Sequence, residues 1–518
     1  MQTMSNWQRL LLALCIGALV PLGLAPFDYT WLGFIGIGLW PWLFNNSMQS
    51  TKPSKPFLLG WSYGSGFFLC GVSWVFVSIY QYSNAGLIGA SLATLGLSVS
   101  LGLFFAIMGS LYQRFAIFHA TLFGFAGIWV AFEWIRSWAF TGFPWAYVGY
   151  SAESSSIFHG FIPLIGIYGC TWVIAWWSSA GIQLITQWKN LANSQKCIHG
   201  CSIILVLAVG IGSQSFQWTT QDQQTMKVAL VQGNVPQKDK WNPLKAQAIS
   251  ETYRRASIDA LRNKADLIVW PEAAVPYLYN DSLAYLELMR KSIEEYQSNA
   301  DQSSYSPRLI TGVLSDLTWP EVKNSVVLLG SSADTDQLYH KQKLVPFGEY
   351  LPFAEQVVRV FPFLEIFKHG ITSGSANQKA FQVNSFLISN FICYEIAFPQ
   401  FVYKNSKDTD ILLTISNDGW FGNSHGPEQH FQMAKFRAIE LGKPVIRATN
   451  TGITAAINQY GIVEKRLPKG VQKYLLADVH KAKGQTPYSR IGPNVILLII
   501  FGLTVIAFLG QRLFRKGK

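Results

Sequence analysis

Long apolar stretches dominate the first 215 residues of this 518-residue chain. This part contains only seven lysines and arginines and three acidic residues, far fewer charges than an ordinary soluble domain carries. About 20 apolar residues can cross the ~30 Å hydrocarbon layer of a membrane as a helix. We therefore predict eight membrane-spanning helices, at 8–25, 31–45, 57–80, 86–113, 118–137, 160–187, 199–215 and 493–511.

The short connections between these stretches predict their orientation. Basic residues occur only in alternate connections and in the C-terminal tail, at Lys52, Lys55, Arg114, Lys189, Lys196, Arg512, Arg515, Lys516 and Lys518. Positively charged loops stay in the cytoplasm. We expect a protein of the inner membrane with both termini in the cytoplasm. The expected domains are seven helices in 1–215, a periplasmic catalytic domain in 216–490, and a last helix with a basic tail in 491–518.

The net charge of +12 raises the question of a nucleic-acid partner. No basic groove-binding helix or aromatic RNA-binding motif accompanies that charge. Basic ends and loops of a membrane protein account for much of it. We therefore expect a membrane and lipids as partners, and no nucleic acid.

Residues 216–490 alternate between strand-like and helix-like patterns, which is typical of an α/β fold. Amphipathic helices are predicted at 244–262, 282–297 and 427–441. Apolar strands are predicted at 226–232, 266–270, 309–314, 325–329, 386–393, 410–416, 445–449 and 453–458.

Three segments of this domain place reactive groups at or just beyond strand ends: Val269–Glu272, Tyr339–Glu349 and Ile392–Glu395. A thiol needs a base to become the nucleophilic thiolate. A carboxylate desolvated at a strand end is expected to have a raised pKa and to take that proton. An ammonium group can stabilise the oxyanion formed by attack on an ester. A Glu, a Lys and a Cys together therefore suffice for acyl transfer.

Each segment also has a simpler interpretation. Cys393 could be a buried apolar residue, and Glu272 a solvated acid after a strand. Lys343 competes with Lys341 as the reactive lysine.

The three segments resemble the Glu-Lys-Cys triad of the nitrilase superfamily. With apolar spans on both sides, the chain resembles the apolipoprotein N-acyltransferase family over essentially its full length. The further motifs that carry this resemblance are Glu133–Trp138, Thr141–Trp145, Gly149–Ser151, Ser416–Gly422 and Arg447–Gly452.

The resemblance implies an α-β-β-α sandwich on an eight-helix transmembrane bundle. It assigns Glu272 as general base and acid, Lys341 as the group that stabilises the oxyanion, and Cys393 as nucleophile. Supporting roles fall to Glu349, Tyr394 and Glu395, and substrate-binding roles to Trp241 and Trp420. No metal or cofactor is implied.

The implied reaction is the final step of lipoprotein maturation. A phospholipid, with phosphatidylethanolamine as the expected donor, gives its acyl chain to Cys393 as a thioester. The N-terminal amine of a diacylglyceryl-cysteine on an apolipoprotein then accepts the chain.

Two other functions are compatible with parts of the sequence. A membrane-tethered amidase or hydrolase would use the same triad with water as acceptor. A transporter would need polar or ionisable groups near the middle of its spans, and these spans contain almost none.

Two features have no assigned role in this reaction. The apolar segment Leu351–Phe367 is expected to dip into the membrane interface as a lid, unless Phe361 and Phe363 are buried in the core. Glu133 and Arg136, near the end of a span, are expected to pair or to reach lipid headgroups.

Overall fold

The computed structural model describes residues 4–48, 54–115, 122–298, 305–360 and 370–516. The chain forms two compact units. One comprises Met1–Trp218, Phe421–Gln432 and Gln485–Lys518, and the other comprises Thr219–Trp420 and Met433–Gly484.

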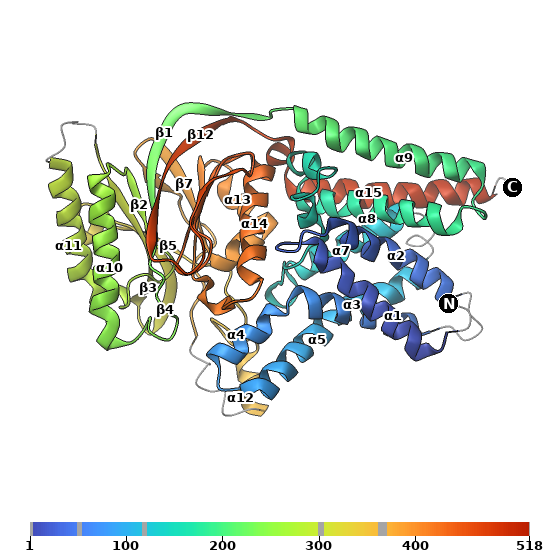
Figure 1. Ribbon diagram of the computed structural model, residues 1–518, viewed down its shortest axis with the longest axis horizontal. Coiled ribbons are helices and arrows are strands. Elements are labelled where there is room, and N and C mark those ends of the chain that lie inside the picture. The colour runs from blue at the N-terminus through green and yellow to red at the C-terminus, as the bar shows by residue number, and fades with distance from the viewer. Residues whose placement is uncertain (1–3, 49–53, 116–121, 299–304, 361–369, 517–518) are drawn as a thin grey trace. The chain divides into compact units, whose positions relative to one another are not determined.

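The first unit is helical, and each predicted apolar stretch contributes a helix to it (Figure 1). Its helices are α1 (Asn6–Leu19), α2 (Thr30–Met48), α3 (Pro56–Gly71), α4 (Trp74–Tyr82), α5 (Gly86–Arg114), α7 (Leu122–Arg136), α8 (Ile162–Gln187), α9 (Asn193–Gly212) and α15 (Pro487–Lys516). Among the described residues, five helices are long and apolar enough to cross a membrane, or six if α3 and α4, bent by 59°, form one span. The count of eight spans stays a prediction.

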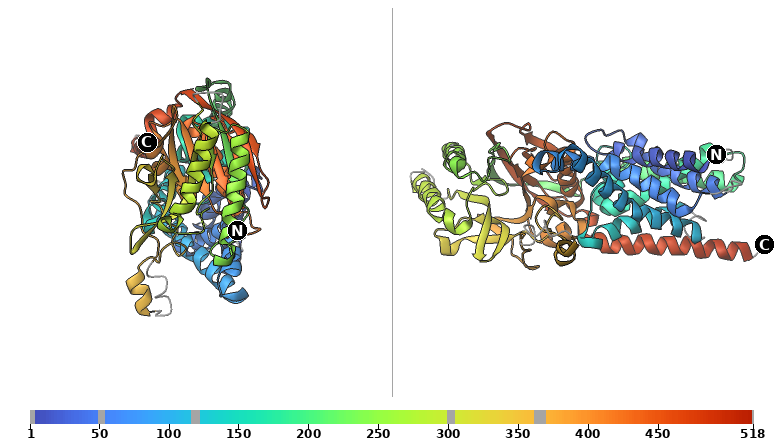
Figure 2. Two further views of the ribbon diagram at one scale, coloured as in Figure 1. Left: turned by 90° about the vertical axis from the view of Figure 1, so that its left-hand side faces the viewer. Right: turned by 90° about the horizontal axis from the view of Figure 1, so that it is seen from below.

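Small residues allow the helices of this unit to pack closely. A Cβ atom on Gly64 of α3 would lie 2.9 Å from the Cα atom of Gly102 of α5, so the two backbones are nearly in contact. Small residues serve the same purpose in membrane helix pairs generally. On the other side of the unit, α15 packs against α7 and α8 (Figure 2).

Glu133, near the end of α7, holds a loop of the helical unit through buried hydrogen bonds. Its Oε1 atom accepts from the Val148 backbone nitrogen at 2.9 Å, and its Oε2 atom accepts from Thr171 Oγ1 at 2.7 Å. Arg136 donates to the Trp145 carbonyl oxygen at 2.8 Å and lies 5.0 Å from the ring centre of Tyr147. Both charged groups therefore organise the loop from inside the protein.

The second unit contains two six-stranded sheets. The first has the order β12-β1-β2-β3-β4-β5, with β1 (Thr219–Gln232), β2 (Leu267–Val269), β3 (Arg308–Thr318), β4 (Glu321–Leu328), β5 (Gln337–His340) and β12 (Lys473–Gly484). The second has the order β11-β10-β9-β8-β7-β6, with β6 (Phe381–Val383), β7 (Phe386–Ile392), β8 (Ile411–Ser416), β9 (Val445–Thr449), β10 (Ala455–Ile457) and β11 (Val463–Arg466).

The two sheets share one apolar core, to which strands of both contribute fully buried side chains such as Val228, Val269, Ile388 and Leu413. A second core lies between the other face of the first sheet and the helices α10 (Pro243–Arg262) and α11 (Tyr279–Ser298). On the second sheet, α13 (Pro399–Ser406) packs against β7. Figure 1 shows these layers.

Parallel strands lie in the middle of each sheet and position the reactive residues. In the first sheet β1, β2 and β3 are parallel, and in the second β7, β8 and β9 are parallel. The carboxyl ends of parallel strands meet at one edge, where α/β folds commonly bind ligands.

The predicted strands and helices of this domain are present, with differences at their ends. β1 begins at Thr219 rather than Met226 because its first half pairs with β12. The strands β5, β6, β11 and β12 were not predicted; β5 and β6 are short, and β11 and β12 are partly exposed, so they lack a strong apolar pattern. In the predicted lid, α12 (Ala354–Val360) is a short helix, and Phe361 and Phe363 lie outside the described residues.

Candidate active site

Glu272 lies just beyond β2, in a turn held against β3. The backbone nitrogen of Ala274 donates to the carbonyl oxygen of Gly312 at 2.9 Å. A Cβ atom on Gly312 would lie 2.7 Å from the Cα atom of Glu272, which is closer than real Cβ atoms approach. Glycine at this position therefore lets the turn approach the sheet.

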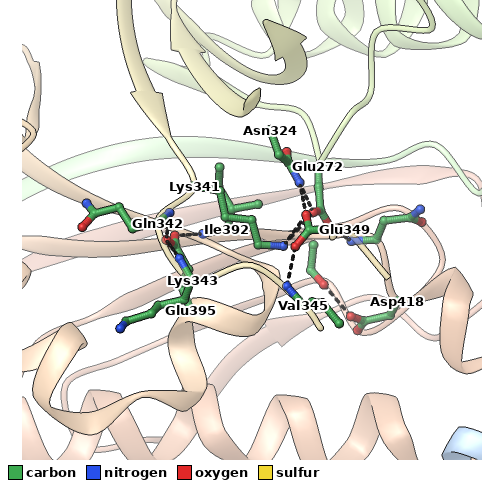
Figure 3. A network of polar contacts seen from close by, with 12 residues as sticks. Glu272, Asn324, Lys341, Gln342, Lys343, Val345, Glu349, Ile392, Glu395 and Asp418 are labelled. Atoms are coloured by element: carbon green, nitrogen blue, oxygen red, sulfur yellow. Dashed lines mark hydrogen bonds and ion pairs between the residues drawn. The ribbon is translucent and has the colours of Figure 1, made fainter. Parts of the chain in front are cut away.

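The Glu272 carboxylate is buried and hydrogen-bonded at both oxygens. Asn324 of β4 donates through Nδ2 to Oε1 at 2.7 Å, and the backbone nitrogen of Asn417, after β8, donates to Oε2 at 2.8 Å. The two sheets therefore hold one carboxylate between them (Figure 3).

Lys341 follows β5 and is 1% exposed. Its Nζ atom lies 2.9 Å from Glu349 Oε1 and 3.5 Å from Glu272 Oε1. Asn324 Nδ2 also donates to Glu349 Oε1, at 2.9 Å. The ammonium thus lies between two carboxylates that share one amide donor.

The alternative lysine has different surroundings. The Nζ atom of Lys343 lies 5.3 Å from the ring centre of Phe398 and 6.0 Å from that of Phe401. The structure brings Lys341, rather than Lys343, to the carboxylates.

Cys393 begins a 3-10 turn directly after β7. It is half-buried and has a φ of +52°, a left-handed conformation that is uncommon for a residue with a side chain. Burial and the negative charge of Glu272 raise the pKa of the Cys393 thiol to about 12, against the opposing effect of the Lys341 ammonium. The thiol is therefore protonated at neutral pH in the resting site.

The expected rise in the pKa of Glu272 is wrong. Burial does oppose its ionisation, but the ammonium groups of Lys341 and Lys240 and hydrogen bonds from Asn324 and Asn417 outweigh burial. Together they hold the pKa of the Glu272 carboxyl below its ordinary value. The resting pair is a carboxylate and a neutral thiol.

Glu395 ties the strand of Cys393 to the segment of Lys341. It is fully buried, and its Oε1 atom accepts from the backbone nitrogen of Gln342 at 2.6 Å. Its Oε2 atom accepts from the backbone nitrogen of Ile392 at 2.8 Å. Burial raises the pKa of Glu395 to about 7. This one carboxyl group therefore connects the two sheets beside the site (Figure 3).

The three remaining predicted residues differ in exposure. Tyr394 is buried and packs edge-on against Phe398, with ring centres 4.9 Å apart. Trp241 and Trp420 are 44% and 48% exposed, so both indoles are open to contact by another molecule.

Sequence reasoning missed Asn324, Asn417 and Lys240 as parts of this site. Asn324 lies between Lys323 and Ser325 in β4, so the sequence gives no clear signal that this polar side chain makes a buried contact. Asn417 acts through its backbone nitrogen and Lys240 lies in a turn, and neither position carries such a signal.

Comparison with known proteins finds two family models and several relatives that match this chain. Residues 227–488 match the carbon-nitrogen hydrolase family model, and residues 16–180 match that of the apolipoprotein N-acyltransferase N-terminal domain. An apolipoprotein N-acyltransferase of Pseudomonas paraeruginosa is 36% identical over 98% of this chain and 97% of that protein. The one of Azotobacter vinelandii is 35% identical over 94% of this chain and 92% of that protein. The solved structure of an amidase from Nesterenkonia sp. is 14% identical, covers 53% of this chain and 94% of its own, and has a TM-score of 0.36.

The second unit and its site define an enzyme with a nitrilase-like, carbon-nitrogen hydrolase domain, joined to a part rich in apolar helices. Because identity above 30% extends over nearly the whole chain, the chain belongs to the apolipoprotein N-acyltransferase family.

Proposed function

We propose that this chain transfers a fatty acyl group from a phospholipid to the N-terminal amine of an apolipoprotein, through a thioester on Cys393. The observation that carries the proposal is the Lys341 ammonium held between Glu272 and Glu349, with the charges of Glu272 and Lys341 acting on the Cys393 thiol. Family membership supports lipoprotein N-acylation.

In the first step, the Cys393 sulfur attacks the carbonyl carbon of the donor ester as Glu272 accepts the thiol proton. Since the pKa of the thiol lies far above that of the carboxyl, the proton moves as the carbon–sulfur bond forms rather than before it. Lys341 stabilises the oxyanion. The carbon–oxygen bond then breaks, and Glu272 returns the proton to the departing lysophospholipid oxygen.

In the second step, the neutral α-amine of a diacylglyceryl-cysteine attacks the thioester carbonyl. Glu272 accepts a proton from the amine nitrogen, the carbon–sulfur bond breaks, and the proton passes to the leaving sulfur. The products are an amide and the free thiol, so no metal or redox group enters the proton and electron balance. Phosphatidylethanolamine is the donor that we propose.

Supporting roles follow from contacts. Glu349 holds Lys341 as an ammonium, and Glu395 holds the Lys341 and Cys393 segments together. Tyr394 packs beside the nucleophile turn. We assign Trp241 and Trp420 to substrate binding because both are large, apolar and exposed.

We propose that the protein lies in the inner membrane with eight spans and both termini in the cytoplasm. Residues 1–215 and 491–518 would form the membrane part, and residues 216–490 a periplasmic α-β-β-α sandwich. The apolar helices and family membership support a membrane protein. Labelling of intact cells with a membrane-impermeant thiol reagent tests this, since Asp222→Cys should react and Lys189→Cys should be protected.

The decisive assay gives the purified protein a phospholipid with a labelled acyl chain and a diacylated lipopeptide. Labelled lipopeptide and lysophospholipid, with a labelled acyl group on Cys393 when the acceptor is omitted, are expected. Release of labelled free acid without acylated peptide would instead identify a membrane-tethered hydrolase.

A further inference from the structure

Lys240 is a buried lysine beside the site. It is not one of the three reactive residues Glu272, Lys341 and Cys393. It lies in the turn before α10 and is 4% exposed, whereas its neighbours Lys238 and Trp241 are exposed. Its Nζ atom donates to the carbonyl oxygen of Glu272 at 2.8 Å. Burial of a lysine is costly unless its charge is compensated, so its inward orientation needs a reason.

The contact with Glu272 stabilises a turn whose backbone is under strain. Ala273, the next residue, has a φ of +45°, a conformation that residues with side chains rarely adopt. Lys240 holds the peptide group between Glu272 and Ala273, while Asn324 and Asn417 hold the carboxylate. Glu272 is thus fixed at its main chain and at its side chain by different groups.

The charges of the site also require a second cation. Two carboxylates, the buried Glu272 and the partly buried Glu349, accompany Lys341. With Lys341 alone the site would carry a surplus negative charge, which opposes formation of a thiolate or an oxyanion. The ammonium of Lys240 brings these four charges to balance.

The groups that face Lys240 come from two elements of the domain. Burial lowers the pKa of Lys240 to about 8, whereas the charges of Glu272, after β2, and of Cys393, after β7, when it is a thiolate, favour the charged form of Lys240. On its own segment, Asp239 forms an ion pair with Lys245 at 2.8 Å.

We propose that Lys240 is a positioning residue of the acyl-transfer site, which fixes the Glu272 turn and supplies the second positive charge that allows Cys393 to lose its proton. The inference rests on the proposed function in so far as Glu272 is the base for Cys393. Lys240 donates to the main-chain carbonyl oxygen of Glu272, and it acts through Glu272 and through its charge.

The test compares four variants of the full-length protein in detergent: Lys240→Met, Lys240→Gln, Lys240→Arg and the control Lys238→Met. Met removes the charge and the donor, Gln keeps a donor without charge, and Arg keeps the charge. Alkylation of Cys393 by iodoacetamide is followed by peptide mass spectrometry from pH 6 to pH 10. This readout uses no lipid, so it tests Lys240 even if the wild-type protein transfers no acyl group.

At pH 7 the Met and Gln variants should alkylate at Cys393 about 10-fold more slowly than wild type, as a rise of about one unit in the thiol pKa would produce. The difference should shrink above pH 8, where wild-type Lys240 itself loses its proton. Lys240→Arg should retain most of the wild-type rate, and Lys238→Met should match wild type. Acyl-enzyme formation from a phospholipid should follow the same order.

Two results would overturn the proposal. One is equal alkylation of wild type and Lys240→Gln across the whole pH range. The other is a loss in Lys240→Gln that is the same at every pH, which would indicate a purely structural role. If Lys240→Met does not fold, as judged by its thermal unfolding, Lys240→Gln carries the comparison, because it retains a donor for the Glu272 carbonyl.

Discussion

The Nζ atom of Lys341 lies closer to Glu349 (2.9 Å) than to Glu272 (3.5 Å). The ammonium is therefore held mainly by Glu349. Glu272 keeps its second oxygen on the backbone nitrogen of Asn417. This division leaves Glu272 as the carboxylate free to exchange a proton, while Glu349 keeps Lys341 charged.

Lys341→Gln should reduce acyl-enzyme formation by at least about 100-fold, the scale seen when one oxyanion-stabilising donor is removed. Lys343→Gln is the matched control, because Lys343 is a lysine on the same segment that lies over the rings of Phe398 and Phe401. Single-turnover labelling of Cys393 by a phospholipid with a labelled acyl chain measures the rate of acyl-enzyme formation in both variants. Equal losses in the two variants would contradict the assignment of Lys341.

Gly312→Ala should displace the Glu272 turn and destabilise the protein by about 1–3 kcal/mol, as overpacking does. Its Cβ atom would lie 2.5 Å from the Pro271 carbonyl oxygen and 2.7 Å from Glu272 Cα. Gly96→Ala in α5 is the control, since a Cβ there meets no atom within 4 Å. Thermal unfolding and the acylation rate are the measurements, and a wild-type rate in Gly312→Ala would show that the turn tolerates displacement.

Cys393 in the resting enzyme should react slowly with iodoacetamide. With its thiol pKa near 12, the thiolate fraction at pH 7 is roughly 3,000-fold below that of a free cysteine with a pKa of about 8.5. The rate should rise with pH, more shallowly between about pH 8 and pH 9 where Lys240 loses its proton, and should still be rising at pH 10 because the midpoint of the thiol is not reached. A plateau that persists from pH 8 to pH 10 would show that the site stabilises the thiolate in its resting state.

Glu133→Leu should lower the unfolding temperature more than Glu153→Leu. The first change leaves the buried donors Val148 N, Trp129 Nε1 and Thr171 Oγ1 without the carboxylate that accepts from them, and each unsatisfied donor costs about 1–3 kcal/mol. Glu153 is partly exposed and accepts a weaker bond, from Gln432 Nε2 at 3.5 Å. Equal unfolding temperatures would mean that Glu133 does not stabilise the loop.

Glu349→Gln should slow acylation, and Glu355→Gln is its matched control. Glu355 is exposed on α12, whereas Glu349 is the closer partner of Lys341 and accepts from the Val345 backbone nitrogen at 2.8 Å. Loss of the Glu349 charge should make the charged form of Lys341 less stable. Acylation should then slow by about 10-fold, equivalent to about 1.4 kcal/mol in the activation free energy. Unchanged acylation in Glu349→Gln would remove Glu349 from the supporting set.

The sequence alone predicted the apolar helices, the α/β domain and, through its resemblance to a family, Glu272, Lys341 and Cys393 as the reactive residues. These signals are local: long apolar runs form helices, buried strands are rich in apolar residues, and Glu272 and Cys393 lie at or just beyond the ends of predicted strands. The motifs also pointed to the correct family.

Only the tertiary structure decided which charges surround Glu272, and it reversed the expected direction of its pKa shift. Desolvation can be anticipated at the end of a buried strand. However, Asn324 and Asn417 donate to the Glu272 carboxylate and Lys240 donates to the main-chain carbonyl oxygen of the same residue, from three separate parts of the chain. Electrostatic interactions depend on distances in space rather than on positions in sequence. The family resemblance already assigned Lys341 rather than Lys343, but only the folded domain shows the Lys341 ammonium between Glu349 and Glu272, because Glu272 comes from a distant part of the chain.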